Sequence, residues 1–426
     1  MTPWRPWVRI GHLILIGAPL MRNRISVKQA NQKDVLRYLR AAGDVSVAEI
    51  AEKVHLSKPT IKKILDLYEI HGLVLAVGKG DSTEEGGKRP TIFRFNRNHG
   101  CALAVHLGPD FVFGALTDLN GNTLHSAYYN FTYRDIDRVI GRVCATIQDL
   151  HERAASNDTE LIGIAVALPG IIDSDNGISV FLPHYVEWGT RVPIGKILQD
   201  RLRLDVPIYF ENVNRLQAFA EFVRGKGVGV QSLVTVDAIC EGLGAGILIK
   251  GGMHQGSEWL SGEIGHMVLQ PDDGPDCICG GKGCFEALVS TKRIMQKLRD
   301  RRASRPDSLV YRNGIEGEAD LDNLFSAYRE GDSLAAEIIE DVVKWFAIGL
   351  NNVIMVYDPE MIILQGIYSE AGPHFLEALR IKIDQMSLPY VNRSVEIVFS
   401  DFGRERGVIG AASYLLSRYF ESEITR

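Results

Sequence analysis

The stretch Ser261–Glu286, SGEIGHMVLQPDDGPDCICGGKGCFE, gathers one histidine and three cysteines, and we call it the Cys/His segment. His266 is followed by Cys277, Cys279 and Cys284, so three of the chain's six cysteines fall within eight residues. Four nitrogen and sulfur ligands close a tetrahedral zinc shell with no open position, which is typical of a structural site. Glycines among the cysteines allow the tight turns that such converging ligands need. We predict a structural zinc site at these four residues; the alternative is a chance cluster of reduced cysteines.

The chain has 426 residues, 46% hydrophobic and 23% charged, which is typical of a soluble globular protein of two to four domains. The cysteines follow no regular disulfide spacing, so we expect a reducing, cytoplasmic location. No apolar run reaches the ~18 residues that cross a bilayer. Residues 1–20 resemble a short signal peptide, but a DNA-binding pattern and metal-type cysteines follow. We therefore expect residues 1–20 to be a non-structural leader or a misassigned start.

The net charge of −6 is unevenly distributed along the chain. Met21–Gly100 carries a net charge of +6, whereas the part from Cys101 onward carries −14. This asymmetry predicts a small module that binds a polyanion, joined to a large acidic body.

Residues 21–97 have the pattern of a winged helix-turn-helix domain. A helix fits Lys28–Ala42, a capping box at Ser46 begins a second helix, and Ser57 caps a third. Two runs with strand composition follow, with a polar, Gly-rich loop between them: Leu73–Val77 and Thr91–Phe95. In this fold the third helix enters the major groove of DNA.

The third helix of this module is expected to turn a basic face outward. Its apolar spacing predicts that four residues face inward: Ile61, Ile64, Leu65 and Tyr68. The candidate DNA-contacting residues are Ser57, Lys58, Thr60, Lys62 and Lys63, with Lys88 and Arg89 of the Gly-rich loop as candidates for the minor groove. A protein–protein module with a solvated basic face is the alternative. The two helix caps and the Lys-rich face favour DNA.

From Cys101 the pattern changes to β-hairpins followed by helices, and it recurs in the second half. We expect the first half to have strands at 101–108, 111–118, 123–131 and 161–167 and a helix at 136–153. We expect the second half to have strands at 233–238, 244–250 and 265–270 and helices at 292–301, 334–357, 373–385 and 405–419. This predicts an α/β body with lobe 1 at 98–220, lobe 2 at 221–400, and a C-terminal helix at 401–426 that returns to lobe 1.

The motif Gly262-Glu-Ile-Gly-His266 with Cys277-Ile-Cys279-Gly-Gly-Lys-Gly-Cys284-Phe-Glu286 resembles that of the ROK family, which contains repressors, open reading frames and sugar kinases. The winged helix resembles that of the family's transcriptional repressors, such as the xylose-operon repressors. The resemblance runs from Met21 to the C-terminus. It implies a two-lobed body with the actin-like, ribonuclease-H-like fold, and it makes His266 a zinc ligand.

The resemblance also implies a sugar pocket. Its lining or rim would contain Asn212, Glu263, His266 and Glu286. Carboxylates and amides suit a pyranose because each can make two directed hydrogen bonds to neighbouring hydroxyls. For the two glutamates the alternative is helix capping or a contact to the zinc ligands. Tyr185 and Trp188 fit either a platform for the sugar ring or the hydrophobic core.

The kinases of this family need further motifs, from which this chain departs. Their phosphate loop Asp-x-Gly-Gly-Thr is matched here by His106-Leu-Gly-Pro-Asp110, and their catalytic aspartate by Val213, which cannot accept a proton. A late glycine pair is reduced to Gln365-Gly366. The run Gly242-Leu-Gly244-Ala-Gly246 is kept, and fits either a phosphate cradle or a Gly-rich hairpin. We therefore predict that the chain is not an enzyme.

These observations predict a sugar-responsive repressor of sugar-utilisation genes, which a free sugar releases from operator DNA. We expect a homodimer or homotetramer that binds a palindromic operator. The alternatives are a sugar kinase with a fused DNA-binding domain and a regulator whose body docks a transport protein. Val213 would leave a C6 hydroxyl unpaired at a cost of ~1–3 kcal/mol. We therefore predict an unphosphorylated pentose, or a sugar whose C6 points to water, as the effector.

Overall fold

The computed structural model describes residues 27–80, 89–156, 159–239, 242–312, 319–386, 388 and 395–425. Residues 1–20, for which we predicted a leader or a misassigned start, lie outside the described residues. The chain forms two compact units: Met1–Asn96 with Glu421–Arg426, called here the N-terminal unit, and Arg97–Phe420, called the body. Across the described residues, no helix is long and apolar enough to cross a membrane.

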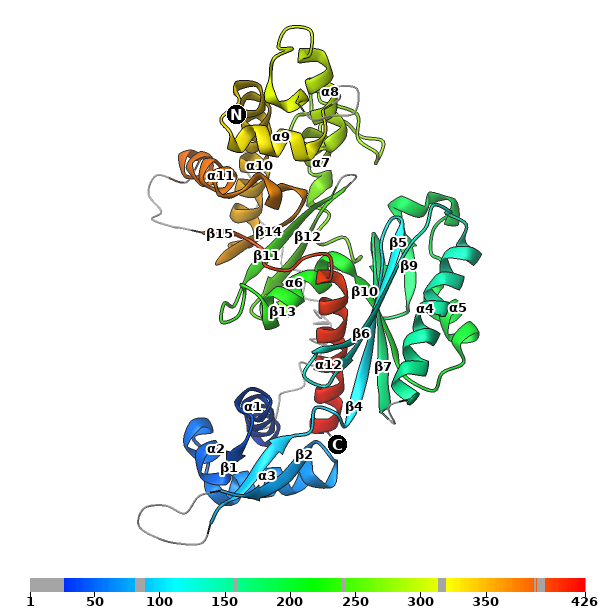
Figure 1. Cartoon of the computed structure of the whole chain (residues 1–426), viewed down its shortest axis with the longest axis vertical. Helices are drawn as coiled ribbons and strands as arrows, with labels where there is room; N and C mark the ends of the chain where they lie inside the picture. Colours follow the sequence, from blue (N-terminus) through cyan, green and yellow to red (C-terminus); the bar gives the residue numbers. More distant parts are fainter. Residues whose placement is uncertain are drawn as a thin grey trace, which may run out of the picture. The chain divides into compact units, whose positions relative to one another are not determined.

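The N-terminal unit is a three-helix domain with a small antiparallel sheet, as the sequence predicts (Figure 1). The helices are α1 (Val27–Ala42), α2 (Val47–Val54) and α3 (Lys58–Ile70). The sheet has the order β1-β3-β2, with β1 (Val45–Ser46), β2 (Val74–Lys79) and β3 (Thr91–Phe95). The two-residue strand β1 was not predicted, because so short a run has no visible alternation.

Local signals in the sequence set the ends of these helices. The predicted capping box is present: the Ser46 Oγ accepts from the Glu49 backbone N–H, and the Glu49 carboxylate accepts from the Ser46 N–H. Such a cap stabilises a helix by about 1 kcal/mol. The inward face of α3 is also as predicted, with Ile61, Ile64, Leu65 and Tyr68 all buried. The Tyr68 hydroxyl donates to the Gln32 carbonyl and thereby fastens α3 to α1.

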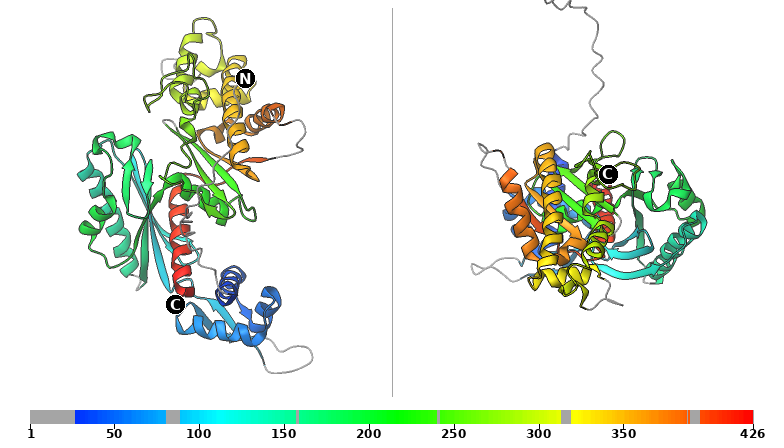
Figure 2. Two further views of the ribbon diagram at one scale, coloured as in Figure 1. Left: turned by 180° about the vertical axis from the view of Figure 1, so that it is seen from behind. Right: turned by 90° about the horizontal axis from the view of Figure 1, so that it is seen from above.

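The first lobe of the body is a five-stranded mixed sheet with the order β10-β7-β4-β5-β6. Its strands are β4 (Gly100–Leu107), β5 (Phe111–Asp118), β6 (Thr123–Asn130), β7 (Glu160–Leu168) and β10 (Ile208–Asn212). The helices α4 (Ile136–Ser156) and α5 (Ile194–Leu202) cover one face of this sheet (Figures 1 and 2). A small ribbon of β8 (Ile171–Asp173) and β9 (Ile178–Phe181) and the 3-10 turn η1 (Pro183–Trp188) connect β7 to α5.

The second lobe repeats this strand order as β13-β12-β11-β14-β15. Its strands are β11 (Leu233–Ile239), β12 (Gly242–Ile249), β13 (Gly252–Met253), β14 (Met361–Gly366) and β15 (Glu396–Phe399). The helices between them are α7 (Phe285–Val289), α8 (Thr291–Arg301), α9 (Leu321–Arg329), α10 (Ser333–Tyr357) and α11 (Pro373–Met386). The strands of each lobe can be numbered by their order along the chain. The first sheet, read from β6 to β10, and the second sheet, read from β13 to β15, then both have the order third, second, first, fourth, fifth. This shared order confirms the predicted two-lobed α/β fold.

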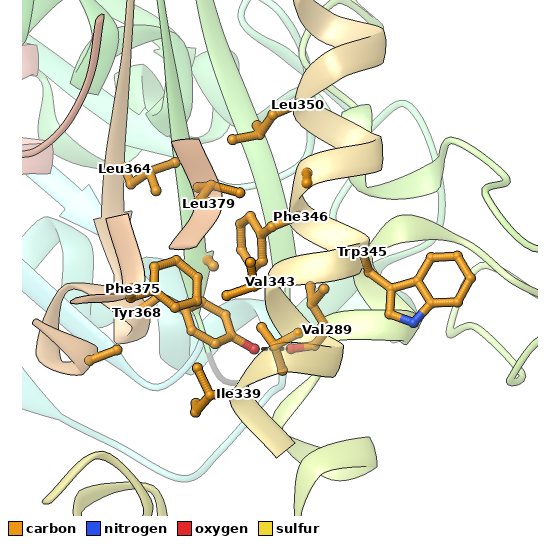
Figure 3. Packing of buried hydrophobic residues seen from close by; sticks show 14 of the residues in the cluster. Val289, Ile339, Val343, Trp345, Phe346, Leu350, Leu364, Tyr368, Phe375 and Leu379 are labelled. Carbon is orange, nitrogen blue, oxygen red and sulfur yellow. Dashed lines mark hydrogen bonds between the residues drawn. The ribbon is translucent and has the colours of Figure 1, made fainter. Parts of the chain in front are cut away.

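Side-chain alternation along β11 gives the second sheet two different hydrophobic faces. Val234 and Val236 belong to the main core with α10 and α11, whereas Leu233 packs with residues of α6 (Val213–Arg224). Three rings lie together in the main core: Tyr368 stacks on Phe375, and Phe346 packs edge-on against both. The Tyr368 hydroxyl donates to the Val289 carbonyl (Figure 3). Each aromatic side chain buried in this way contributes roughly 1.5–3 kcal/mol.

Two helices pack on the sheet of the other lobe. Helix α6 follows β10 of the first lobe, yet it packs against β11 and β12 of the second. Helix α12 (Arg406–Thr425) follows β15, yet its Tyr414 ring packs edge-on against Tyr209 of β10. The two helices also meet, since the Phe219 ring of α6 contacts Tyr414. The boundary that we predicted between residues 220 and 221 therefore falls inside α6.

One predicted strand is wrong. Residues 265–270 form no strand of the second sheet; they begin as the 3-10 turn η2 (Ile264–His266) and then pair with the end of the Cys/His segment. The backbone N–H of Leu269 donates to the Gly283 carbonyl, and that of Phe285 donates to the Met267 carbonyl. The alternation that suggested a strand therefore reflects pairing within the segment, and β13 is the third strand of the sheet.

Candidate functional sites

The Cys/His segment brings its four predicted ligands together. One ligand atom from each of His266, Cys277, Cys279 and Cys284 lies within 4.8 Å of all the others. The Sγ atoms of Cys279 and Cys284 are 3.7 Å apart, and the Cys277 Sγ is 3.7 Å from the His266 Nδ1. A tetrahedral shell with metal–sulfur bonds near 2.3 Å has edges of about 3.8 Å. The side chains therefore form a group that can hold a metal ion.

Gly283 is the glycine that allows the four side chains to converge. Gly283 has a φ of +67°, and a Cβ there would collide with the Gln270 carbonyl. The two arms of the turn are tied by the Cys277 N–H, which donates to the Gly281 carbonyl at 2.9 Å, and by the Gly283 N–H, which donates to the Pro275 carbonyl at 2.8 Å. Cys277 and Cys284 thus lie on the two arms, and Cys279 lies in the turn between them.

The two predicted sugar-binding glutamates lie beside this group. The Glu263 Oε2 is 4.0 Å from the His266 Nε2, the ring nitrogen that does not face Cys277. Glu286 lies in the first turn of α7, and its Oε2 accepts from the Leu243 N–H at 3.0 Å. Burial raises the pKa of Glu263, the nearby Glu286 carboxylate adds to the rise, and His266 and Arg215 oppose it. Among the described residues, no donor lies within hydrogen-bond range of the Glu263 carboxylate.

Asn212 is mainly a helix cap. It is the N-cap of α6, where its Oδ1 accepts from the N–H groups of Asn214 and Arg215 at 2.8 and 3.1 Å. Its Nδ2 donates to the Gly170 carbonyl at 2.7 Å. An asparagine amide has two donors and one oxygen acceptor. Only one N–H of Asn212 is therefore left for a ligand, a limit that the sequence did not reveal.

Sequence reasoning missed a buried ion pair beside Asn212. Glu211 and Arg215 have side chains only 1% exposed, and the Arg215 Nε donates to the Glu211 Oε1 at 2.7 Å. The remaining donors of Arg215 reach the carbonyls of Trp259 at 3.1 Å and Ile172 at 3.3 Å. The Gln255 Nε2 donates to the second oxygen of Glu211 at 2.7 Å. The i,i+4 spacing of Glu211 and Arg215 was the one available signal, and it usually marks an exposed helix face.

At the carboxyl ends of the central strands, polar side chains from several elements form what we call the strand-end cluster: His106, Asp237, Gln365 and Arg406. Arg406 begins α12, and its Nη2 donates to both oxygens of Asp237 at 2.9 and 3.1 Å. His106 is buried, and burial together with the Arg406 charge lowers its pKa to about 3. The Phe111 ring packs edge-on against His106, with ring centroids 5.0 Å apart.

The Gly-rich run Gly242–Gly246 belongs to a packed hairpin. Gly244 and Gly246 lie in β12, and a Cβ at either position would collide with Asn214 of α6. These glycines allow α6 to pack closely on β12, which favours the hairpin interpretation over a phosphate cradle. Tyr185 and Trp188 likewise belong to the core. The Tyr185 hydroxyl donates to the Gly108 carbonyl at 2.6 Å, and the rings lie 4.6 Å apart.

The outward face of α3 carries the predicted DNA-contacting residues. Ser57 caps α3 and shares a hydrogen bond of 2.8 Å with the Thr60 hydroxyl. Lys58 and Lys63 are exposed, and the described part of the chain offers them no acidic partner. Lys62 is different, because its Nζ lies 2.5 Å from Asp66 and above the Phe93 ring. Arg89 is exposed, and Lys88 lies outside the described residues.

The fold and these sites define a class of protein: a winged helix-turn-helix module joined to a two-lobed α/β body with a Cys/His metal-ligand group. The sequence profile of the ROK family matches residues 102–418, and a winged helix-turn-helix DNA-binding profile matches residues 29–69. The chain belongs to the ROK family, as the motif of the Cys/His segment predicted.

Several relatives match different shares of the chain. The xylose repressor of Bacillus spizizenii is 26% identical over 395 residues, which cover 93% of this chain and 97% of the repressor. A glucokinase of Thermotoga maritima is 32% identical over 281 residues, which cover 66% of this chain and 86% of the kinase. A solved ROK family transcriptional regulator, a homologue of the Escherichia coli MLC protein, has a TM-score of 0.78 and 24% identity over 94% of this chain and 98% of its own, and this likeness shows the fold alone.

Proposed function

We propose that this protein is a sugar-responsive transcriptional repressor of sugar-utilisation genes. The N-terminal unit binds operator DNA, and a free monosaccharide bound in the body weakens that binding. The observation that carries the proposal is that one chain joins a winged helix-turn-helix to a ROK body. A repressor relative matches 93% of the chain, whereas the kinase relative matches 66%.

The sugar is proposed to bind beside the Cys/His segment. Glu263 supports this role because its half-buried carboxylate has no donor among the described residues, and sugar hydroxyls are donors. Glu286 has one oxygen free of the Leu243 N–H, His266 presents its Nε2, and Asn212 has one N–H left. Together these groups can accept from and donate to neighbouring hydroxyls of one pyranose.

Val213 bears on the identity of the sugar. Its buried side chain begins α6 directly after Asn212, and it offers no acceptor to a hydroxyl. A C6 hydroxyl left without a hydrogen-bond partner would cost ~1–3 kcal/mol of binding free energy. A pentose such as D-xylose has no C6 hydroxyl and avoids this cost. We expect calorimetry to show D-xylose binding more tightly than D-glucose or a sugar 6-phosphate. Tighter binding of D-glucose would contradict this choice of effector.

The body is proposed to lack phosphoryl transfer. Val213 cannot serve as a general base. The Arg406–Asp237 pair satisfies two charges with each other at the strand ends, and a carboxylate there would repel a phosphate. A coupled ATPase assay with D-xylose and D-glucose tests the alternative of a kinase with a fused DNA-binding domain. Turnover in the wild type that is lost on substituting Glu211 and Asn212 together would favour the kinase.

Zinc is the metal that we propose for the Cys/His segment. Three thiolates and one imidazole favour zinc among the common cellular metals, and four protein ligands leave no position for a reacting group. Its proposed role is therefore to hold the loop that carries Glu263 and Glu286. Metal analysis of the purified protein, before and after dialysis against a chelator, tests this assignment.

The operator is proposed to be palindromic and bound by a homodimer or homotetramer. Fluorescence anisotropy with DNA from upstream of the protein's own gene tests the whole proposal. We expect tight, salt-dependent binding that weakens 5–150-fold with the effector, taken from a panel of D-xylose, D-glucose and N-acetyl-D-glucosamine. Unchanged operator affinity with every sugar, or no preference over random DNA, would contradict it.

A further inference from the structure

The buried pair of Glu211 and Arg215 fastens three separate segments of the body to one another. Arg215 lies on α6, donates to the Ile172 carbonyl of β8 in the first lobe, and donates to the Trp259 carbonyl in the loop before Glu263. Gln255, at the start of the same loop, donates to Glu211. The loop 255–259 is therefore held at both ends by a single ion pair.

The next residues of the chain dock this loop against β12. Gly262 has a φ of +101° and its carbonyl accepts from the Ala245 N–H at 2.8 Å. A Cβ at Gly262 would collide with the Ala245 carbonyl, so only glycine fits. Glu263 follows directly, between the anchor at Trp259 on one side and His266 on the other. Its backbone N–H donates to the Leu260 carbonyl at 3.2 Å, which closes the turn.

Arg215 donates its hydrogen bonds to acceptors within the protein. Its guanidinium binds Glu211 and two backbone carbonyls, and its side chain is 1% exposed, so it is not placed to contact a sugar. Only a planar fork of donors can serve a carboxylate and two carbonyls from different segments at once. A lysine would keep the charge beside Glu211 but could not reach both Trp259 and Ile172.

We propose that Arg215 is a positioning residue for effector binding: through the Trp259 carbonyl it holds the 255–263 loop so that Glu263 faces the sugar. This inference rests on the proposed sugar-sensing function. It predicts that Arg215 sets effector affinity while leaving the metal group and the operator-binding surface of the N-terminal unit unchanged. A residue needed only for general stability would affect all three together.

The test compares Arg215→Lys with the wild-type full-length protein. We expect calorimetry with D-xylose, D-glucose and N-acetyl-D-glucosamine to show at least tenfold weaker binding of the effector to Arg215→Lys. Zinc content and sugar-free operator affinity should match those of the wild type. Hydrogen exchange should rise in residues 255–263 and stay unchanged in residues 277–284.

A control on the same helix is Arg224→Lys, at the other end of α6, where the side chain is exposed. Arg224 also donates to a backbone carbonyl, that of Gly121 at 2.5 Å, but it has no bond to the 255–263 loop. We expect this variant to keep wild-type sugar affinity. Equal losses in both variants would mean that Arg215 acts through the stability of α6, and the inference would be overturned.

The remaining outcomes separate the two proposals. Wild-type sugar affinity in Arg215→Lys overturns the inference and leaves the proposed function standing. No binding of any of the three sugars to the wild type contradicts the proposed function, and with it the role of Arg215 in sensing. If Arg215→Lys is too unstable to purify, Gln255→Ala is a milder variant that removes one of the two anchors of the loop. Gln255→Ala should also weaken sugar binding. Unchanged sugar affinity in Gln255→Ala would likewise overturn the inference.

Discussion

The two groups of polar side chains in the body differ in what satisfies their charges. In the strand-end cluster the opposite charges of Arg406 and Asp237 neutralise each other, since Arg406 binds both oxygens of Asp237. The His106 Nδ1, the Gln365 Oε1 and the Arg406 Nε are buried there without a hydrogen-bond partner among the described residues. Beside the Cys/His segment, Glu263 is half-buried yet receives no hydrogen bond from the residues that the structure describes. Buried polar groups normally find partners within the protein. The difference lies in the charges: a carboxylate without a hydrogen-bond donor remains beside the Cys/His segment, where we propose the sugar to bind, whereas the charges of the strand-end cluster are neutralised by the chain's own ion pair.

The largest effect on the protein's response to sugar is expected from a substitution in the Cys/His segment, beside the proposed sugar site. Cys279→Ser removes one of the four proposed metal ligands, so zinc should be lost and the loop that carries Glu263 should lose its proposed support. We expect the sugar response of operator binding to disappear, while the winged helix still binds operator DNA. Anisotropy titrations with and without the effector sugar measure both quantities.

Cys144→Ser is the matched control, since it removes a buried thiol of the first lobe that is remote from the metal group. It should keep the sugar response. Full induction in Cys279→Ser would show that the metal group does not support sensing.

The next largest effect is expected on the stability of the fold, from a substitution in the strand-end cluster. Arg406→Met leaves the buried Asp237 without its partner, and breaking such a pair costs roughly 3–5 kcal/mol. We expect urea denaturation to show a drop of about 3 kcal/mol in the free energy of unfolding. The double variant Arg406→Met with Asp237→Asn should recover much of that loss. No gain of ATP turnover should accompany either variant, and a gain would mean that the ion pair merely masks a working phosphate site.

A moderate effect is expected for α3, the helix that we propose to face DNA. Lys58 and Lys63 are exposed, whereas Lys62 is already paired with Asp66. Lys58→Ala and Lys63→Ala should each weaken operator binding and reduce the slope of log K against log salt by about 0.9, the value for one lost phosphate contact. Lys62→Ala is the internal control and should change the slope less. An equal decrease in the salt slope for all three variants would show that Lys62 contacts DNA as Lys58 and Lys63 do, despite its ion pair with Asp66.

The last effect concerns His106 and is expected only in acid, with no contribution at neutral pH. Its pKa is lowered to about 3 by burial and by Arg406, so the folded protein keeps it neutral while the unfolded chain takes up a proton near pH 6.5. Stability should therefore fall as the pH drops from about 6.5 towards 3, by at most about 1.4 kcal/mol per pH unit from this group. Unfolding of wild type and His106→Gln across this range measures the difference. Parallel curves would mean that His106 is solvated in the folded protein.

Much of the fold could be predicted from local patterns. The capping box at Ser46, the inward face of α3 and the hairpins of the first lobe all depend on residues close together in the sequence. The strand expected at 265–270 failed because its partner is the other arm of the Cys/His segment. Which of two apolar segments a strand pairs with is a long-range property that alternation does not encode.

The metal group was predictable because its ligands lie close together in the sequence, whereas the surroundings of the sugar site were not. Asn212 was assigned to the sugar, yet most of its hydrogen-bonding capacity caps α6. The Glu211–Arg215 pair was missed because the carbonyls that Arg215 binds, those of Ile172 and Trp259, come from segments more than forty residues away. Helix-like spacing shows that two residues are neighbours, but it does not show whether a distant loop will cover them.

The central claim is that sugar binding and operator binding oppose each other. Linkage requires the effect to be reciprocal, so the sugar must bind the operator complex more weakly than the free protein. The direct measurement is calorimetric titration of D-xylose into the zinc-loaded protein, alone and saturated with operator DNA. The account predicts affinity 5–150-fold weaker in the operator complex. Equal affinity in the two titrations would contradict it.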